Sequence, residues 1–476
     1  MFLKTRIIAT IGPAIVGSIN NPHRFHDQQF AEERRVAEQK ITDLILRGVN
    51  IFRLNLSHNT IDNHLFITNW IREIAERLKI SVQFIFDTKG PEIRVGQMSN
   101  NAMVKANDIL TIYTKKQIVG DDKGFSVSDV TNTYSMADDV KVGSQILVDD
   151  GKLVFEAVEV DQEAGIIKAK SYNGFELKTN KRINLPNTKY SIPFLSDKDK
   201  NDIKKAIENK IDFLALSFIA NSAQLQQVYD YINSLKINTS IRLIAKIENQ
   251  EAIDNINSLI AEFDAIMIAR GDLGLEINYA RIPFYQEKII RLCRLAKKPV
   301  IVATQMLDSL EKNILPTRAE VNDVYHAVKA RANAVMLSGE TAAGIDPVNA
   351  VNVLNKIIFE TEKTFFNSKI IQKDICHLEI ERKLKKDVLE FSLQKSKKPK
   401  YLLVNTVQTE ARTIQDIAQH EFGFTTIFNI TEHVRNNLIL RDVNLIFNEN
   451  PIKTKKELAE ILQENEDAFE LLIINI

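Results

Sequence analysis

Short apolar runs rich in β-branched residues recur along the first 340 residues, and amphipathic stretches separate them. Runs of this kind favour β-strands, and the spacing of apolar positions between them favours helices. Eight such runs occur, at residues 6–12, 49–57, 81–88, 213–218, 241–248, 265–270, 299–306 and 334–340. Strands that alternate with helices predict a parallel sheet covered by helices, and eight units match a closed (β/α)8 barrel. A doubly wound open sheet is the alternative, although that architecture does not require eight units.

The segment between the third and fourth runs has a different pattern. Apolar and polar positions alternate in it, as in "SQILVDDGKLVFEAVEV", and Gly, Asn and Asp interrupt the alternation. A period of two residues indicates antiparallel strands with one buried face. Pro91 and Pro186 flank the segment and suit stiff hinges. We therefore expect residues 91–185 to form a small antiparallel β-domain inserted into a βα loop.

The pattern changes again after residue 350. Apolar runs alternate with helical stretches there, at residues 401–407, 425–431, 444–448 and 470–476. This alternation predicts a C-terminal α/β domain. The predicted fold class is thus α/β, and the predicted domains are a (β/α)8 barrel of residues 1–90 and 186–350, the insertion at 91–185 and the C-terminal domain at 351–476.

Composition and charge narrow the class of protein. A chain of 476 residues is too long for one compact core, and its 44% hydrophobic and 26% charged residues are ordinary for a globular protein. Basic and acidic residues both number 62, and this balance argues against nucleic acid or an acidic membrane as the main partner. The two cysteines lack metal-binding spacing, and the N-terminus lacks an apolar stretch of signal-peptide length. We expect a cytoplasmic protein without a membrane-spanning segment.

The polar residues of the eight runs gather at or just after their C-terminal ends. They are Arg53, Asn55, Ser57, Asp87, Thr88, Ser217, Lys246, Glu248, Arg270, Asp272, Thr304, Gln305, Ser338 and Glu340. In a (β/α)8 barrel the C-terminal strand ends form one face, and this face carries the active site. Each residue alone has an alternative role as a satisfied core polar group or helix cap, and Lys246 with Glu248 as a buried ion pair. One polar mouth explains the whole set better.

The residue types at this mouth favour phosphoryl transfer. Glu248 and Asp272 are hard carboxylate ligands that suit Mg²⁺ or Mn²⁺, with water and substrate filling the other positions. Arg53 and Lys246 are two cations that suit a phosphoryl group in transfer. The backbone N–H of Gly271 lies where an anion can approach closely. Together these groups predict catalysis by positioning and charge stabilisation.

A second group of oxygen ligands consists of Asn55, Ser57, Asp87 and Thr88. Three neutral groups and one carboxylate suit a weakly bound monovalent cation. Other chemistries are not indicated. The strand ends carry no Ser–His or Cys–His pair, and the sequence contains neither GxxxxGK[ST] nor GxGxxG. Covalent acyl transfer and P-loop or Rossmann nucleotide binding are therefore disfavoured.

A series of motifs at these positions resembles the pyruvate kinase family. In chain order they are "ATIGPA" (9–14), "RLNLSH" (53–58), "DTKGPEIR" (87–94), "VDDGKL" (148–153), "KIEN" (246–249), "ARGDLGLE" (269–276), "ATQMLDSL" (303–310), "PTRAEVNDV" (316–324) and "MLSGETAAG" (336–344). The resemblance extends from residue 4 to about residue 350. It implies a (β/α)8 domain, an inserted β-rich domain that closes as a lid, and a C-terminal α/β domain.

The resemblance implies transfer of the phosphoryl group of phosphoenolpyruvate to ADP, which gives pyruvate and ATP in the last step of glycolysis. It implies that Lys246 stabilises the phosphoryl group in flight, that Arg53 binds this group, and that Thr304 assists the proton path to the enolate carbon. By motif position the substrate-binding residues are Arg53, Lys246, Gly271, Asp272 and Thr304.

The resemblance also implies cation and nucleotide sites. The expected Mg²⁺ (or Mn²⁺) ligands are Glu248 and Asp272, and the expected K⁺ ligands are Asn55, Ser57, Asp87 and Thr88. The expected residues on the nucleotide side are His58, Arg94 and Lys181. Glu92 occupies the family position where Glu accompanies K⁺ dependence, so we expect activation by K⁺. Family analogy further implies a homotetramer.

The sequence departs from the family pattern at several positions. Asn59 stands where the family has Gly, and Ala220 stands where it has Arg. The segment at residues 15–30 is longer than usual, and we expect a loop insertion there. The C-terminal domain resembles the family only weakly. Two alternative functions therefore stay open: another Mg²⁺-dependent (β/α)8 lyase or aldolase acting on pyruvate enolates, and a catalytically idle homologue that senses metabolites.

Overall fold

The large barrel contains eight parallel strands. The computed structural model describes residues 3–99, 102–129, 134–365, 400–406, 425–430, 444–447, 453–462 and 470–475. The strands close in the order β1-β17-β16-β15-β14-β13-β3-β2. Their bounds are β1 (Arg6–Thr10), β2 (Val49–Asn55), β3 (Gln83–Asp87), β13 (Phe213–Leu216), β14 (Arg242–Ile247), β15 (Ala265–Ala269), β16 (Val300–Ala303) and β17 (Ala334–Leu337). Each lies within one of the eight predicted runs, and the closed barrel confirms the predicted fold class over the open sheet.

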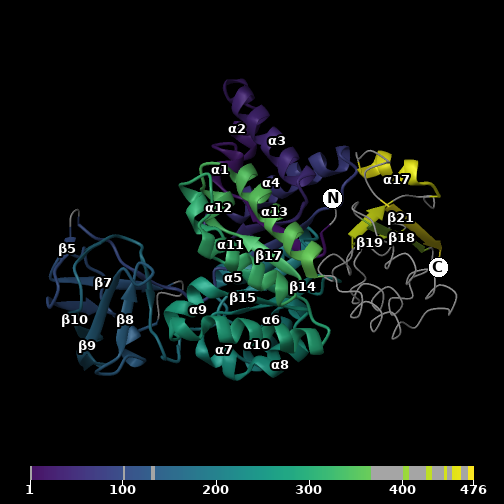
Figure 1. The fold of residues 1–476 in the computed structure, drawn as a ribbon. Coiled ribbons are helices and arrows are strands. Elements are labelled where there is room, and N and C mark those ends of the chain that lie inside the picture. Colours follow the sequence, from purple (N-terminus) through teal and green to yellow (C-terminus); the bar gives the residue numbers. More distant parts are fainter. Residues whose placement is uncertain are drawn as a thin grey trace.

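Helices cover the outside of this barrel (Figure 1). Among them are α3 (Ala31–Leu46), α4 (Ile61–Arg77), α5 (Asp197–Glu208), α6 (Ser222–Ser234), α8 (Ile256–Glu262), α10 (Ile282–Leu295), α11 (Arg318–Lys329) and α13 (Pro347–Phe365). Three further helices begin within three residues of a strand end: α7 (Gln250–Asp254), α9 (Arg270–Glu276) and α12 (Gly339–Ala342). None of the helices in the described ranges is long and apolar enough to cross a membrane.

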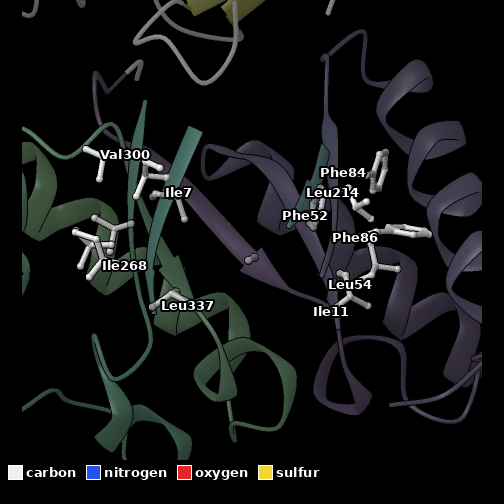
Figure 2. Packing of buried hydrophobic residues seen from close by; sticks show 14 of the residues in the cluster. Ile7, Ile11, Phe52, Leu54, Phe84, Phe86, Leu214, Ile268, Val300 and Leu337 are labelled. Carbon is white, nitrogen blue, oxygen red and sulfur yellow. The ribbon is translucent and has the colours of Figure 1, made fainter. Parts of the chain in front are cut away.

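Alternate strand residues build two separate cores. One set, which includes Phe52, Phe84 and Leu214, packs against the surrounding helices, as Figure 2 shows. The other set, which includes Ile85 and Met267, packs only against other strand residues and fills the barrel interior. Side chains of a strand alternate between its faces, so strands buried on both faces carry continuous apolar runs. This double burial explains why the pattern of the chain predicts these strands well.

The strands end slightly before the predicted runs do. Glu248 is the last residue of the fifth predicted run, whereas β14 ends at Ile247. The cause is the start of the next helix, because the side chain of Asn249 accepts a hydrogen bond from the backbone N–H of Ala252 at 2.8 Å and caps α7. The functional side chains therefore follow the strands or occupy their last residues.

The insertion forms a second closed barrel beside the first (Figure 1). Its seven strands follow the order β10-β6-β7-β4-β12-β8-β9. Their bounds are β4 (Ile93–Val95), β6 (Ile109–Tyr113), β7 (Gly124–Asp129), β8 (Gln145–Val148), β9 (Leu153–Asp161), β10 (Ile166–Ser171) and β12 (Arg182–Asn184), and a separate pair consists of β5 (Ala102–Val104) and β11 (Phe175–Leu177). The predicted antiparallel pairing is wrong for one pair, since β6 and β7 run parallel. An apolar core around Phe125 and Phe155 fills this small barrel.

The C-terminal sheet contains four parallel strands in the order β20-β19-β18-β21. They are β18 (Lys400–Thr406), β19 (Thr425–Ile430), β20 (Asn444–Phe447) and β21 (Glu470–Asn475), and helix α17 (Lys455–Leu462) lies between the last two in sequence. These strands coincide with the four predicted runs. The predicted helical stretches other than α17 lie outside the described residues.

The segment at residues 15–30 contains short helices where we expected a loop. Helix α1 (Pro13–Val16) precedes α2 (Pro22–His26) and the 3-10 turn η1 (Gln28–Phe30). Asn21 caps α2 by accepting a hydrogen bond from the N–H of Arg24 at 3.1 Å. The ring of Phe25 packs 5.1 Å from that of Trp70 on α4. Local caps and this aromatic contact therefore order a segment whose extra length predicted a loop insertion.

Candidate active site

A cavity of about 290 Å³ lies between the mouth of the large barrel and the rim of the small one. Most of the predicted site residues line it: Arg53, Asn55, Ser57, His58, Thr88, Arg94, Lys181, Lys246, Glu248 and Asp272. Three predicted residues are not in its lining. Asp87 is buried beneath it, and Gly271 and Thr304 contact each other at its side. Side chains from five strand ends of the large barrel thus meet at one face, as the barrel topology predicts.

Lys246 is the centre of a buried ion-pair network. Its Nζ lies 3.0 Å from Asp87 Oδ1 and 2.8 Å from Glu248 Oε1, and it donates a hydrogen bond to Ser217 Oγ at 2.7 Å. Burial alone lowers the pKa of a lysine, but the carboxylates of Asp87 and Glu248 outweigh it and raise the pKa of Lys246. Lys246 therefore keeps its positive charge in a nearly water-free environment.

Arg53 is the second cation, and the same carboxylate, that of Asp87, holds it in place. Its Nε donates to Asp87 Oδ2 at 2.7 Å, and its side chain also reaches Thr10 Oγ1 at 3.2 Å. Burial raises the pKa of Asp87, but the charges of Lys246 and Arg53 outweigh this effect and lower it. One buried carboxylate thus fixes both cations next to the cavity, with like charges held apart by their shared partner.

Glu248 has the chemistry of a metal ligand. Burial raises its pKa to about 7, while the charge of Lys246 opposes the shift. Its Oε2 accepts a hydrogen bond from the N–H of Phe218 at 2.6 Å, whereas its buried Oε1 has only the ion pair with Lys246 and no hydrogen bond among the described residues. A buried carboxylate oxygen with unused acceptor capacity fits Mg²⁺ or Mn²⁺.

The metal donor set is small. The second predicted ligand, Asp272, lies in the first turn of α9 and lines the same cavity. In the part of the chain that the structure describes, no group of three or more His, Cys, Asp or Glu side chains forms a metal site. Two carboxylates with the remaining positions left to water and substrate are the arrangement that the sequence predicts for Mg²⁺. The residues present therefore fit a divalent ion shared with a substrate.

The predicted monovalent-cation ligands are brought together only in part. Asn55, Ser57 and Thr88 all line the cavity. The side chain of Asn55 accepts a hydrogen bond from the N–H of Ser57 at 3.1 Å, and Thr88 Oγ1 accepts one from the N–H of Ser217 at 3.1 Å. Asp87 lies below them with both carboxylate oxygens engaged by cations. Its negative charge is near this group, but its oxygens already have partners.

Thr304 is held in an unusual backbone conformation. Thr304 and Gln305 have φ angles of 67° and 52°, in the left-handed region that β-branched residues rarely adopt. The guanidinium of Arg270 donates to the carbonyl oxygens of Thr304 and Gln305 at 2.7 and 3.0 Å and pairs with Asp323 at 2.6 Å. The N–H of Gly271 donates to Thr304 Oγ1 at 2.7 Å. Arg270 therefore positions the threonine, a role that the motif alone did not indicate.

The predicted nucleotide-side residues come from both barrels. His58 follows β2, whereas Arg94 lies on β4 and Lys181 precedes β12. Arg94 pairs with Glu92 at 2.8 Å, and Lys181 pairs with Asp149 at 2.9 Å. Burial lowers the pKa of His58, and the charge of Arg94 acts in the same direction. The imidazole is therefore neutral near neutral pH, and the positive charges near it come from both barrels, with Arg94 on the small one and Arg53 on the large one.

The two departures from the family pattern have local structural explanations. Asn59 has a φ of 62°, a conformation that Gly adopts freely and Asn tolerates better than most residues. Its side chain also accepts a hydrogen bond from the N–H of Thr60 at 2.9 Å. Ala220 is buried, and its N–H donates to Gln224 Oε1 at 2.7 Å. Asn59 thus preserves the turn, and the backbone at Ala220 is supported without a charged side chain.

Sequence reasoning missed two residues that connect the barrels. Arg182, at the start of β12, pairs with Asp272 across the cavity. Glu276, at the end of α9, accepts hydrogen bonds on Oε1 from Asn184 Nδ2 and from the Tyr190 hydroxyl, both at 3.0 Å. Burial raises the pKa of Glu276 to about 7. The available signal was the pair of basic residues, Lys181 followed by Arg182, just before "INLP".

The sequence of the chain is similar to proteins of one family. Residues 2–351 match the family model described as pyruvate kinase, barrel domain. The chain is 44% identical over 365 residues to the pyruvate kinase of Mycoplasma genitalium. The aligned region covers 76% of this chain and 72% of the relative. It is 38% identical over 371 residues to the pyruvate kinase of Geobacillus stearothermophilus, and the aligned region covers 78% of this chain and 59% of that relative.

Solved structures give the same result. A crystal structure of a pyruvate kinase from Cryptosporidium parvum is similar with a TM-score of 0.79 at 31% sequence identity, and the match covers 99% of this chain and 94% of the other. A structure of the Cryptosporidium parvum enzyme in complex with ADP has the same TM-score and identity, and the match covers 99% of this chain and 92% of that one. The similarity in structure therefore extends over all three parts of the chain, beyond the match to the family model.

Proposed function

The chain belongs to the pyruvate kinase family, and we propose that the cavity between its two barrels is where it carries out the family reaction. The chain has pyruvate kinase function: it transfers the phosphoryl group of phosphoenolpyruvate to ADP and forms pyruvate and ATP. The similarity to named pyruvate kinases supports this activity over a lyase or an idle sensor. The observation that carries the site assignment is the buried, charged Lys246 next to Arg53 at the cavity wall.

The two cations stabilise the phosphoryl group during its transfer. The bond between phosphorus and the enol oxygen breaks, a bond to a terminal oxygen of ADP forms, and the enolate carbon gains a proton. Negative charge on the transferred group faces Lys246 and Arg53, which are already oriented by Asp87 and need little reorganisation. Residues of the small barrel form one wall of the cavity, and its closure over bound substrates would limit water that hydrolyses the phosphoryl group.

The substrate carboxylate and the proton path involve the neighbouring turn. We assign the backbone N–H groups of Gly271 and Asp272 to the substrate carboxylate. The hydroxyl of Thr304, whose backbone carbonyl the Arg270 clamp holds in place, assists proton delivery to the enolate carbon once the substrate carboxylate replaces it as acceptor of the Gly271 N–H. The strained φ of Thr304 supports this assignment, because strained residues gather at sites where their orientation matters.

Glu248 and Asp272 are the residues that would hold Mg²⁺ or Mn²⁺. A divalent ion held by these two carboxylates would neutralise negative charge on the substrate during phosphoryl transfer. Glu248 supports this assignment because its Oε1 has acceptor capacity to spare in a buried site.

Asn55, Ser57, Asp87 and Thr88 are assigned to K⁺. Three of them line the cavity, and Glu92 lies close enough to pair with Arg94 there. We expect K⁺ to activate the enzyme, and the test compares rates in K⁺-containing and K⁺-free buffer at equal ionic strength. Equal rates in the two buffers would refute the assignment.

Residues 91–185 are assigned as a lid that closes over the nucleotide. His58, Arg94 and Lys181 lie on the nucleotide side, and two of these three belong to the small barrel. The proposed division of the chain is a catalytic domain of residues 1–90 and 186–350, this lid, and a C-terminal domain of residues 351–476.

We further propose a homotetramer that works in the cytoplasm, with no nucleic acid or membrane as partner. The homotetramer rests on analogy with the family, and the balanced charge of the chain supports the absence of a nucleic-acid or membrane partner. Light scattering of the purified protein tests the homotetramer, since it reports the mass of the assembly directly. A monomer mass would contradict it.

The decisive test of activity is ADP phosphorylation from phosphoenolpyruvate in the presence of Mg²⁺ and K⁺. Pyruvate formation is followed by coupling it to NADH oxidation. We expect turnover that requires both substrates and the divalent ion. Absence of turnover at saturating substrates would contradict the proposed function.

A further inference from the structure

One cation in the lining of the cavity, Lys89, differs from the others in its surroundings. The Lys and Arg side chains of this lining are Arg53, Lys89, Arg94, Lys181, Arg182 and Lys246. All of them except Lys89 pair with a carboxylate: Arg53 and Lys246 with Asp87, Arg94 with Glu92, Lys181 with Asp149 and Arg182 with Asp272. Within the described parts of the chain, the ammonium group of Lys89 makes neither an ion pair nor a hydrogen bond. A cation of this kind at a cavity wall suits an anionic ligand.

The carboxylates whose charges act on Lys89 already have other partners. They are Glu92 and Asp199. Glu92 Oε2 accepts hydrogen bonds from Nε and Nη2 of Arg94 at 3.0 and 2.8 Å. Asp199 Oδ1 accepts one from the N–H of Gly90 at 3.3 Å, and Asp199 Oδ2 belongs to the capping box at the start of α5. Lys89 therefore receives no direct contact from either carboxylate.

The backbone around Lys89 is fixed at the mouth of the large barrel. Lys89 follows the end of β3 by two residues. Before it, the N–H of Thr88 donates to the carbonyl oxygen of Ala215 on β13 at 3.0 Å. After it, Gly90 adopts a φ of 65° and packs so closely against Ser217 that a Cβ atom there would lie 2.9 Å from the Ser217 carbonyl oxygen. Both neighbours of Lys89 are thus held on the large barrel, and its flexible side chain can follow a ligand in the cavity.

The surroundings of Lys89 indicate which anion it meets. Its charge acts on His58 and the charge of Arg94 acts on it, and both of these neighbours are assigned to the nucleotide side. Burial lowers the pKa of Lys89, the charge of Arg94 acts in the same direction, and a bound phosphate would oppose both. Lys89 also lies two residues after Asp87, which fixes the two cations assigned to the transferred phosphoryl group. An anion at Lys89 is therefore placed between the nucleotide side and that group, where the terminal phosphate of ADP must be for transfer.

We propose that Lys89 binds the terminal phosphate of the nucleoside diphosphate and so adds to the nucleotide site a cation carried by the large barrel. The inference rests on the proposed function, because it takes ADP as the acceptor of the phosphoryl group. Two anions must approach each other for this transfer, and a cation at the acceptor phosphate lowers their repulsion. Lys89 thus complements Arg94 and Lys181, which the small barrel carries.

Calorimetric titration of the full-length chain with ADP tests the proposal in the presence of Mg²⁺ and without phosphoenolpyruvate. We expect Lys89→Gln to weaken ADP binding roughly tenfold, as the loss of a charge-assisted contact does, and Lys89→Met to behave alike. Lys89→Arg keeps the charge and should stay close to the wild type. AMP lacks the terminal phosphate, so its affinity should be the same in the wild type and in Lys89→Gln.

Steady-state kinetics provide a second measurement, and Lys204→Gln is the matched control. The Michaelis constant for ADP should rise in Lys89→Gln by about the same factor as the binding constant, and that for phosphoenolpyruvate should not change. Lys204 lies on α5 of the same barrel, is half exposed, is 3.9 Å from Glu208 and is not in the cavity lining. Its replacement removes one positive charge and should leave both Michaelis constants at the wild-type values.

The possible outcomes separate this assignment from the function on which it rests. Unchanged ADP affinity of a Lys89→Gln protein that folds normally, as judged by circular dichroism, would overturn the assignment. Equal weakening of ADP and AMP would also overturn it, because the terminal phosphate would then not be the group that Lys89 contacts. A raised Michaelis constant for phosphoenolpyruvate with unchanged ADP affinity would place Lys89 at the other substrate. A wild-type protein without turnover would overturn the proposed function itself, and this inference with it.

Discussion

The two barrels of this protein are both closed sheets, yet they contribute to the active site in different ways. The eight strands of the large barrel are parallel, so all their C-terminal ends meet at one mouth, and polar residues from many strands gather there. Most strand pairs in the small barrel are antiparallel, so consecutive strand ends point to opposite rims. Its contribution comes from a few residues at the rim that faces the mouth, such as Arg94, Lys181 and Arg182. Parallel topology alone brings polar residues together at one end of the large barrel. The small barrel contributes residues only because one of its rims faces that end.

The strands of the two barrels also differ in how they are buried. All residues of β1 and β15 are buried, because helices cover one face and the barrel interior the other. In β9 of the small barrel, buried residues alternate with more exposed ones along the first half of the strand. The large barrel therefore depends on helix packing for its stability, and the small barrel depends on a single internal core. Four predictions test this comparison.

The largest effect is expected at the mouth of the large barrel. Lys246→Met keeps the length of the side chain but removes the charge that we assign to stabilising the phosphoryl group. Loss of a single neutral donor at such a site costs roughly 10²–10³ in turnover, so we expect the loss of this cation to lower turnover by several orders of magnitude. The coupled assay measures it, with Lys170→Met on an exposed position of β10 as the control. A near-normal rate for Lys246→Met would show that Lys246 is only structural.

The second prediction separates the two cores. Phe155→Ala removes a fully buried ring from the small barrel and should destabilise it by about 3–5 kcal/mol. We expect amide hydrogen exchange to accelerate in residues 93–184 while the strands of the large barrel stay protected. Val158→Ala, on the same strand and 38% exposed, is the control and should change stability by less than about 0.5 kcal/mol. Equal acceleration in both barrels would show that they unfold as one cooperative unit.

The third prediction concerns pH and the connection between the barrels. The pKa of Glu276 rises from 4.5 unfolded to about 7 folded, so the folded state binds more protons between these values and stability falls as pH rises through that window. Glu276→Gln keeps an oxygen acceptor for Asn184 and Tyr190 but cannot ionise. It should be more stable than the wild type by up to about 3 kcal/mol above the folded pKa, and by much less near the unfolded one. Urea unfolding on both sides of the window measures this difference, and a constant difference would contradict the prediction.

The smallest effect is expected at the rim of the small barrel. Lys181→Gln removes a partly exposed cation that pairs with Asp149. An exposed ion pair stabilises a contact by at most about 1 kcal/mol, and the same limit applies to an ion pair between Lys181 and bound ADP. We therefore expect the Michaelis constant for ADP to rise a few-fold, with little change in turnover. Lys152→Gln is the control, because Lys152 contacts the same carboxylate at 3.4 Å but is not part of the cavity lining. Equal effects of the two substitutions would indicate a change in local charge without a nucleotide contact.

Much of the fold could be predicted from the sequence, for physical reasons that differ between regions. The eight strands of the large barrel were predictable because burial on both faces gives continuous apolar runs. The parallel pairing of β6 with β7 was not, since alternation with a period of two does not reveal the direction of a neighbouring strand. The short helices within residues 15–30 were missed because the extra length of this segment was interpreted as a loop insertion, although Asn21 and Asp27 are capping residues in it.

The candidate site was predictable where chemistry follows a strand end along the chain. Lys246 and Glu248 share a face because side chains alternate, and the 2.8 Å between Nζ and Oε1 agrees with that prediction. Arg182 could not be paired with Asp272 in this way, because 90 residues separate them and they belong to different barrels. The position of Thr304 also depends on a clamp by Arg270, and no local pattern specifies that contact.

Closure of the two barrels has a further consequence for association between copies of the chain. A sheet that closes on itself has no edge strand, so neither barrel presents a row of unpaired backbone groups to which another strand can add. Among the described residues, sheet edges occur only in the β5–β11 pair and at β20 and β21 of the C-terminal sheet. Within the described ranges, strand addition between molecules, with its risk of aggregation, is therefore confined to this short two-stranded pair and to the C-terminal sheet, and none of these strands contributes a residue to the cavity lining.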